Sequence, residues 1–212
     1  MRSVNEAVEV VLTGYERRAE EEMRLMRADP AEFGKRIDEF LISIGPETGQ
    51  LLHVLATGAG AKVILELGAS YGYSAVWLAD AARATGGIVH SVELSQRKVD
   101  YAREQLTRAG VASFVEFHVG NALDVLPQLA GPFDFVLLDL WKDLYSPCFE
   151  LLHPKLAPGA LVAADNMIFP PSSQPDARAY QALVRAKGDM DSVLLPIGSG
   201  VELSRKRGSD RR

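Results

Sequence analysis

The sequence has little cysteine, no long apolar run and no excess of positive charge. The single cysteine among 212 residues, Cys148, excludes an internal disulfide framework and fits a reducing compartment, so we expect a cytoplasmic protein. No apolar run approaches the roughly 18 residues that a membrane-spanning helix needs. The formal net charge of −5 gives no general attraction to nucleic acid or to an anionic membrane. We therefore predict a globular protein without a nucleic-acid or membrane partner.

The first 45 residues are expected to form a helical extension. Ser3-Val4-Asn5-Glu6 has the Ser-x-x-Glu form of a capping box, and apolar residues at helical spacing predict a helix toward Arg27. Its apolar stripe needs covering, which predicts a homodimer. Asp29-Pro30 and Gly45-Pro46 break the pattern. The length suits one domain over residues 1–212, comprising the extension (1–45), a core (46–206) and a short basic tail (207–212).

Beyond residue 62, short apolar runs alternate with amphipathic helices. This alternation is typical of a mostly parallel sheet with helices on both faces. The last two runs are separated only by residues 196–200, too few for a parallel crossover, so they predict an antiparallel C-terminal hairpin. The predicted fold is thus an α/β protein with a seven-stranded, mostly parallel sheet. Its strands are expected at 62–67, 88–92, 114–118, 133–138, 160–164, 192–195 and 201–204.

A glycine-containing loop, Glu66 to Ser74, follows the first predicted strand. Gly68 and Gly72 carry no Cβ and could let a ligand approach the backbone, although a tight turn is the alternative. The loop is not the G-x-G-x-x-G of a pyrophosphate site. The second strand ends at Glu93, which could accept both hydrogen bonds of a ribose diol or could simply be solvated. Residues 120–122, just past the third strand, would then flank an adenine.

Polar side chains end the fourth and fifth predicted strands. Asp139 follows one strand and Asp165-Asn166 the other, so two carboxylates and an amide oxygen should meet at one edge of the sheet. Such an oxygen-rich pocket suits a hard divalent cation, and Lys142 is placed to act beside it. The alternatives are a strand-end cap, a solvated lysine and an Asx-turn. The four histidines, His53, His90, His118 and His153, show no ligand spacing and are expected to be structural or surface residues.

Four segments together resemble the cation-dependent O-methyltransferases, a family that includes the catechol and caffeoyl-CoA O-methyltransferases. They are Glu66 to Ser74, Val119 to Leu129, Leu138 to Asp143, and Asp165-Asn166. The residues at 45–50 and 195–200 are most similar to the bacterial branch. The resemblance implies a Rossmann-like class I fold that uses S-adenosylmethionine (SAM). It also implies methyl transfer to a hydroxyl of a vicinal-diol phenol of the catechol, caffeoyl or flavonoid type.

The resemblance further implies residue roles. Asp139, Asp165 and Asn166 would hold Mg²⁺, with Mn²⁺ or Ca²⁺ as alternatives, and Lys142 would be the base. The chain departs from catechol O-methyltransferase at two positions: Leu140 stands where that enzyme has a histidine, and about Val193 stands where it has a glutamate that grips the second hydroxyl. The loss of that glutamate argues against catechol itself as the acceptor. The residues implied to line the cofactor site are Ile44, Glu66, Gly68, Ser74, Glu93, Ala122 and Asp139, with Trp141 packing near the adenine.

The sequence disfavours two other functions. Methylation of tRNA or another RNA is disfavoured by the negative charge and by the lack of an Asn-Pro-Pro-Tyr type motif after the fourth strand. A SAM-binding protein without catalysis is disfavoured because Lys142 and all three expected metal ligands are present.

Overall fold

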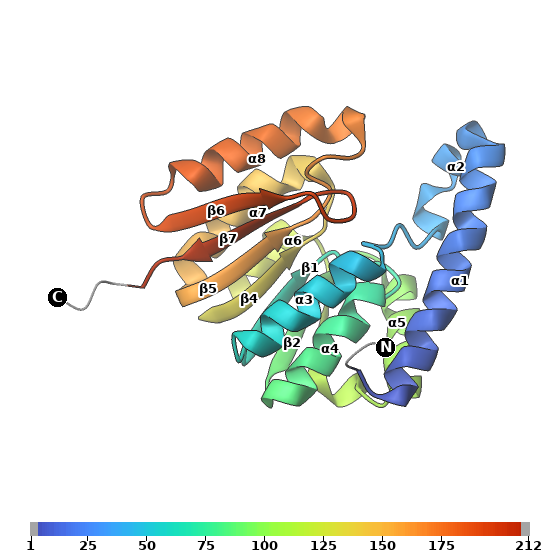
Figure 1. Ribbon diagram of the computed structural model, residues 1–212, viewed down its shortest axis with the longest axis horizontal. Helices are drawn as coiled ribbons and strands as arrows, with labels where there is room; N and C mark the ends of the chain where they lie inside the picture. Colours follow the sequence, from blue (N-terminus) through green and yellow to red (C-terminus); the bar gives the residue numbers. More distant parts are fainter. Residues whose placement is uncertain (1–3, 209–212) are drawn as a thin grey trace.

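The computed structural model describes residues 4–208, and within them the chain builds one seven-stranded sheet (Figure 1). The strand order is β3-β2-β1-β4-β5-β7-β6; the first five strands of the chain run parallel, while β6 and β7 form an antiparallel hairpin. The predicted fold is confirmed. The strands are β1 (Val63–Leu67), β2 (Ile88–Glu93), β3 (Val115–Val119), β4 (Phe133–Leu138), β5 (Leu156–Ala164), β6 (Met190–Leu195) and β7 (Val201–Lys206).

Only β5 differs notably from its predicted range, because it begins at Leu156 rather than at residue 160. Pro158-Gly159 is the kind of dipeptide that indicates a turn. The strand nevertheless continues through it: Phe133 pairs with Leu156, Phe135 pairs with Leu161, and the register shifts between the two pairs. The extra residues bulge out of the ladder, so a local turn signal did not end the strand.

Two apolar clusters cover the two faces of the sheet, because alternate residues of each strand point to opposite sides. Ile64 packs with α1, α3, α4 and α5, whereas its neighbour Leu65 packs with α6, α7 and α8. The helices are α1 (Glu6–Ala28), α2 (Pro30–Lys35), α3 (Pro46–Gly58), α4 (Tyr73–Thr85), α5 (Gln96–Arg108), α6 (Ala122–Val125), α7 (Tyr145–Leu152) and α8 (Gln174–Ala186), with short 3₁₀ turns between them.

Helix α1 begins two residues later than the capping box predicted. Its N-cap is Asn5, whose side chain accepts a hydrogen bond from the backbone N–H of Val8 at 2.9 Å. Ser3 and the tail residues 209–212 lie outside the described residues. No helix in the described part of the chain is both long and apolar enough to cross a bilayer.

The apolar stripe of α1 is already covered within the chain. Its residues Val8, Val11, Leu12 and Tyr15 are buried, and α1 packs along α4 and α5 (Figure 1). The stripe therefore needs no second copy, so this basis for a homodimer is wrong. The dimer itself stays a prediction.

Candidate active site

The carboxyl ends of β1, β4 and β5 lie side by side, and the polar residues predicted from the sequence follow them directly. The backbone N–H of Asp139 donates to Leu67 O at 2.9 Å, and that of Asp165 donates to Leu138 O at 3.0 Å. The hydrogen-bond ladder thus continues one residue past each strand. It brings Asp139 and Asp165 to neighbouring positions at one edge of the sheet, as predicted for the ends of parallel strands.

Asp165 is a buried carboxylate with no partner. Its side chain is 1% exposed, and neither of its oxygens has a hydrogen-bond partner among the residues that the structure describes. Burial, reinforced by the nearby charge of Asp139, raises the pKa of Asp165 to about 8. The charge of Lys142 and the backbone of Asn166 oppose this shift only in part, and burying a carboxylate that is not fully compensated costs several kcal/mol. The next residue in the chain, Asn166, carries an amide oxygen, and the chemistry of these groups fits a divalent cation that would supply positive charge.

Lys142 lies beside these carboxylates and is itself buried. Its Nζ is 3.8 Å from Asp139 Oδ1 and donates hydrogen bonds to Leu140 O at 2.9 Å and to Tyr145 Oη at 2.6 Å. Burial lowers the pKa of Lys142, against the opposing effect of the carboxylates of Asp139 and Asp165. The amine is thus held in a fixed place and its neutral form is made more accessible.

Tyr145 holds Lys142 but was not predicted from the sequence. The ring is fully buried at the start of α7, and its hydroxyl donates to Leu138 O at 2.7 Å while accepting from Lys142. The only local signal is the three-residue spacing between Lys142 and Tyr145. An aromatic residue at the start of an amphipathic helix is usually a core residue, so this signal is weak.

Glu66 provides a second buried acceptor below the glycine-containing loop. Ser91 Oγ donates to Glu66 Oε2 at 2.5 Å, whereas the buried Oε1 has no hydrogen-bond partner within residues 4–208. Burial raises the pKa of Glu66 to about 7, although the hydroxyls of Ser74 and Ser91 oppose this shift. The unpaired oxygen fits an N–H donor of a bound cofactor. Ser91, like Tyr145, was not predicted because it reaches Glu66 from the neighbouring strand.

The two loop glycines are required by packing rather than by ligand access. At Gly68, with φ +95°, a Cβ would stand 2.3 Å from the carbonyl oxygen of Asp139; at Gly72, with φ +94°, it would stand 2.6 Å from Ala102 Cβ of α5. The expectation that Gly72 opens the backbone to a ligand is therefore not supported by its surroundings. Gly68 instead lets the loop after β1 approach the residue after β4.

A narrow cavity, partly open to solvent, lies between this loop and the segment before α3. Ile44, Gly68, Ser74 and Asp139, four of the predicted cofactor residues, are among its lining residues. The segment Leu41 to Ile44 forms its other wall, which the sequence did not reveal beyond Ile44.

The other predicted cofactor residues lie outside this cavity. Both oxygens of Glu93 accept backbone hydrogen bonds, from Ser70 N at 2.8 Å and from Ser95 N at 2.9 Å, so the carboxylate joins the loop to the start of α5. Ala122 is buried at the start of α6, and Trp141 is 60% exposed. Trp141 follows the cavity residue Asp139 by two positions, and its exposed indole offers an apolar face and an N–H donor.

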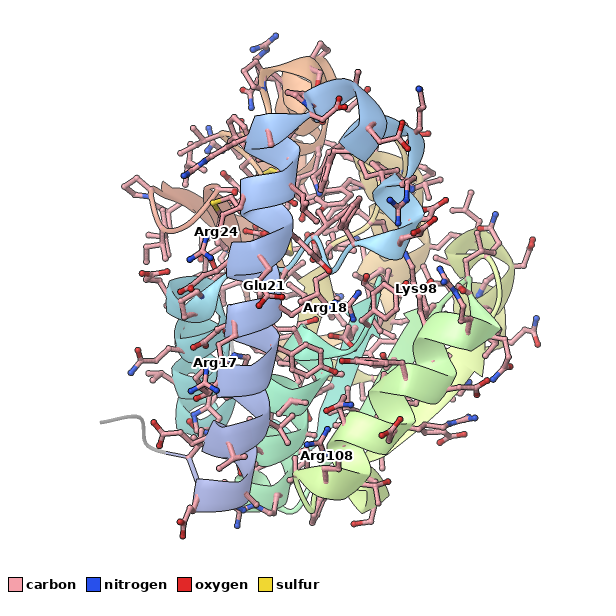
Figure 2. The ribbon with its side chains drawn as sticks, turned by 90° about the vertical axis from the view of Figure 1, so that its right-hand side faces the viewer. Arg17, Arg18, Glu21, Arg24, Lys98 and Arg108 are labelled. Atoms are coloured by element: carbon pink, nitrogen blue, oxygen red, sulfur yellow. The ribbon has the colours of Figure 1, made fainter. Side chains whose placement is uncertain are left out.

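Helix α1 fixes both walls of the cavity. Tyr15 Oη donates to Tyr71 O in the loop at 2.5 Å, and Arg18 Nη2 donates to Glu39 O at 3.0 Å ahead of the segment Leu41 to Ile44. The Arg18 guanidinium also lies 4.4 Å from the centroid of the Tyr71 ring. Figure 2 shows Arg18 on the side of α1 that faces α5. The N-terminal extension therefore takes part in shaping the site.

Backbone strain is concentrated at this edge of the sheet. Among the described residues, the non-glycine residues with positive φ are Ile42, Ser70 and Asn166, at +45°, +47° and +56°. Two of them line the cavity and the third is a predicted metal ligand. Positive φ is a clear outlier for a β-branched residue such as Ile42. Residues held in such conformations cluster at functional sites.

Comparisons with known proteins agree with this geometry. A model of a family described as O-methyltransferase matches residues 19–207. The catechol O-methyltransferase of Niastella koreensis is 35% identical over 169 residues, 74% of this chain and 76% of that protein. Caffeoyl-CoA O-methyltransferase 2 of Zea mays is 30% identical over 187 residues, which cover 78% of this chain and 70% of that protein.

A solved structure extends the likeness to the whole fold. The O-methyltransferase TomG from Streptomyces achromogenes, in complex with SAM, has a TM-score of 0.76 and 27% identity, and the match covers 98% of this chain and 92% of that one. The resemblance inferred from the sequence motifs is confirmed: this chain belongs to the O-methyltransferase family.

Proposed function

We propose that the chain transfers the methyl group of SAM to a hydroxyl of a vicinal-diol phenol, with the help of a divalent cation. The observation that carries the proposal is Asp165, a buried carboxylate without a partner next to Asp139 and Lys142. The names of the two relatives, a catechol and a caffeoyl-CoA O-methyltransferase, support an aromatic diol as the acceptor class.

In this proposal, Asp139, Asp165 and Asn166 hold the cation, which is Mg²⁺ or else Mn²⁺ or Ca²⁺. A cation held by these three residues would have room left for the oxygens of the acceptor. When bound, the cation supplies positive charge that makes an acceptor hydroxyl easier to ionise. The SAM site would comprise Ile44, Glu66, Gly68, Ser74, Glu93, Ala122, Asp139 and Trp141.

Lys142 is the group that takes the proton. A phenol and a lysine both titrate near pH 10, so deprotonating either at pH 7 costs roughly 4 kcal/mol. Burial reduces that cost for the amine by lowering the pKa of Lys142. A neutral amine has two N–H bonds and one lone pair. Leu140 O and Tyr145 Oη accept hydrogen bonds from the two N–H groups. The lone pair is then left to take the hydroxyl proton.

The methyl transfer then balances without further groups. The ionised acceptor oxygen forms a bond to the methyl carbon as the bond from that carbon to the sulfonium sulfur breaks. The products are the methyl ether and S-adenosylhomocysteine, and the proton held by Lys142 passes to solvent. The walls fixed by α1 would hold the two reactants in line, and such positioning can supply about 7–11 kcal/mol.

A turnover assay with SAM and a catechol-type diol, with and without EDTA, tests this function. We expect methylation that EDTA abolishes and Mg²⁺ restores, because the carboxylates at the site need a cation to bind the diol. A monophenol of the same size is the control and should react poorly. SAM binding without turnover on any diol would favour a non-catalytic SAM-binding protein, and methylation of RNA instead of diols would favour an RNA methyltransferase.

We also propose that the chain forms a homodimer through the C-terminal part of α1, beyond the buried apolar stripe near its start. Met23, Leu25 and Met26 are exposed there, and Leu25 is 58% exposed. Burying such a patch would be favourable, by about 25 cal/mol per Å². Light scattering at micromolar concentration should give the mass of two chains, and Leu25→Glu should reduce it to one. A monomeric wild-type protein would refute this proposal.

A further inference from the structure

We propose that His90, Glu116 and His118 form a binding site for a zinc-like transition-metal ion, separate from the cation site at Asp139 and Asp165. The three residues lie on β2 and β3, on the face of the sheet that packs against α6 and α7. Their ligand atoms all lie within 4.8 Å of one another. This site does not depend on the proposed methyl transfer.

The pairing of the two strands explains why the residues converge. In the parallel register of β2 and β3, His90 is the partner of Glu116, and Val92 is the partner of His118. Residues two apart on a strand point to the same face, so all three side chains project from one side of the sheet. The histidines are 28 residues apart in the chain. This separation explains why ligand spacing was not visible in the sequence.

The distances already suit one small ion. His90 Nδ1 lies 3.2 Å from His118 Nε2 and 3.6 Å from Glu116 Oε2. Two nitrogens bound at about 2.0–2.1 Å to a tetrahedral zinc are roughly 3.3 Å apart. The ion could therefore replace the contact between the imidazole rings with little movement. The Glu116 side chain is 60% exposed, which leaves an open side for entry and for a water ligand.

The rings are held in place by neighbours. The centroids of the two imidazole rings are 5.4 Å apart, and His90 also meets the buried ring of Phe133 edge-on at 6.5 Å. The other two histidines differ, since each faces one carboxylate: His53 contacts Asp80 and His153 contacts Asp189. Asp80 is also bound by Arg83, whose charge opposes a metal ion there.

The donor set selects the kind of ion. Two imidazoles and a carboxylate suit Zn²⁺, Co²⁺, Ni²⁺ or Cu²⁺, whereas Mg²⁺ prefers oxygen ligands. The consequence is mechanical, because β3 is an edge strand paired only with β2. A bound ion would link β3 to β2 close to the end of β3, just before Gly120. Since the ion binds the folded chain alone, it should raise the melting temperature.

The test is a titration of the full chain, stripped of metal, with Co²⁺ and then Zn²⁺. We expect cobalt to develop the visible absorption of a tetrahedral complex with imidazole ligands and zinc to displace it. The variant His118→Gln should weaken zinc binding at least about tenfold and remove the melting-temperature increase. His153→Gln is the matched control, because His153 also faces a carboxylate. This variant should leave zinc binding and the melting-temperature increase unchanged.

Two further variants make the outcome decisive. Glu116→Gln changes an exposed side chain, should fold normally and should also weaken zinc binding; it replaces His118→Gln if that variant does not fold. Asp165→Asn alters the other cation site and should retain the cobalt absorption. The proposal is overturned if cobalt gives no saturable signal at submillimolar concentration. It is also overturned if zinc binding is lost in Asp165→Asn but kept in Glu116→Gln.

Discussion

The variant Asp165→Asn is expected to lose cation-dependent methyl transfer by at least about 10³-fold, because several kcal/mol of charge stabilisation depend on this ligand. The substitution keeps the size of the side chain and removes only its charge. The measurement is turnover with saturating SAM over a range of Mg²⁺ concentrations. Asp143→Asn is the matched control, because Asp143 is exposed one residue after Lys142 and should have little effect.

Stability gives this prediction a second readout that does not depend on activity. The pKa of Asp165 is raised from an ordinary value near 3.9 to about 8. The folded state therefore holds the extra proton between these limits, and the metal-free protein should lose stability as the pH rises from about 4 to about 8. Asp165→Asn should remove this loss.

Added Mg²⁺ should raise the melting temperature of the wild type but not of Asp165→Asn, because only the wild type has the carboxylate that needs a cation. A variant with normal turnover and a normal response to Mg²⁺ would contradict the role proposed for Asp165.

The positions of Asp139 and Asp165 could be predicted because they depend on local features. An apolar run that ends in an acidic residue marks the end of a strand, and consecutive parallel strands place their carboxyl ends at one edge. The same reasoning located Lys142, which lies in the turn directly after β4. The number of strands follows from the alternation of apolar runs and helices in the same way, whereas their order in the sheet comes from the structure.

The partners of Glu66 and Tyr71 could not be predicted, because they come from segments distant in the chain. Ser91 reaches Glu66 across a strand pair, and Tyr15 reaches Tyr71 from a helix 56 residues earlier. Such contacts depend on register and on how a helix is placed against the sheet. Local spacing carries no information on either.

The two histidines of the proposed zinc site also show that local spacing cannot reveal contacts made across a strand pair. His90 and His118 have no ligand spacing, yet the register of β2 and β3 brings their nitrogens to 3.2 Å. A rule that seeks short spacings finds metal sites within one helix or loop and overlooks those built across a strand pair. Only once the strand order is known does the pairing of Glu116 with His90 become predictable.

Lys142→Met is expected to lower turnover by roughly 10² to 10⁴, the usual contribution of a general base, or about 3–5 kcal/mol of barrier. Methionine has a similar length and can occupy the same buried space, so SAM affinity should stay within about twofold, since substitutions of similar volume disturb packing little. The measurement is kcat by a coupled assay, together with SAM binding by calorimetry.

Lys142→Arg distinguishes two roles of this residue, accepting a proton and providing a positive charge. Arginine keeps a positive charge beside Asp139 but cannot lose a proton at neutral pH. If Lys142 is the base, the arginine variant should be about as slow as the methionine variant. Tyr145→Phe, which removes a hydrogen-bond partner of the amine, should instead keep most of the activity and shift the pH at which the rate rises. Full activity in Lys142→Arg would show that the site needs only a cation at this position, and proton removal would then have to be assigned to solvent.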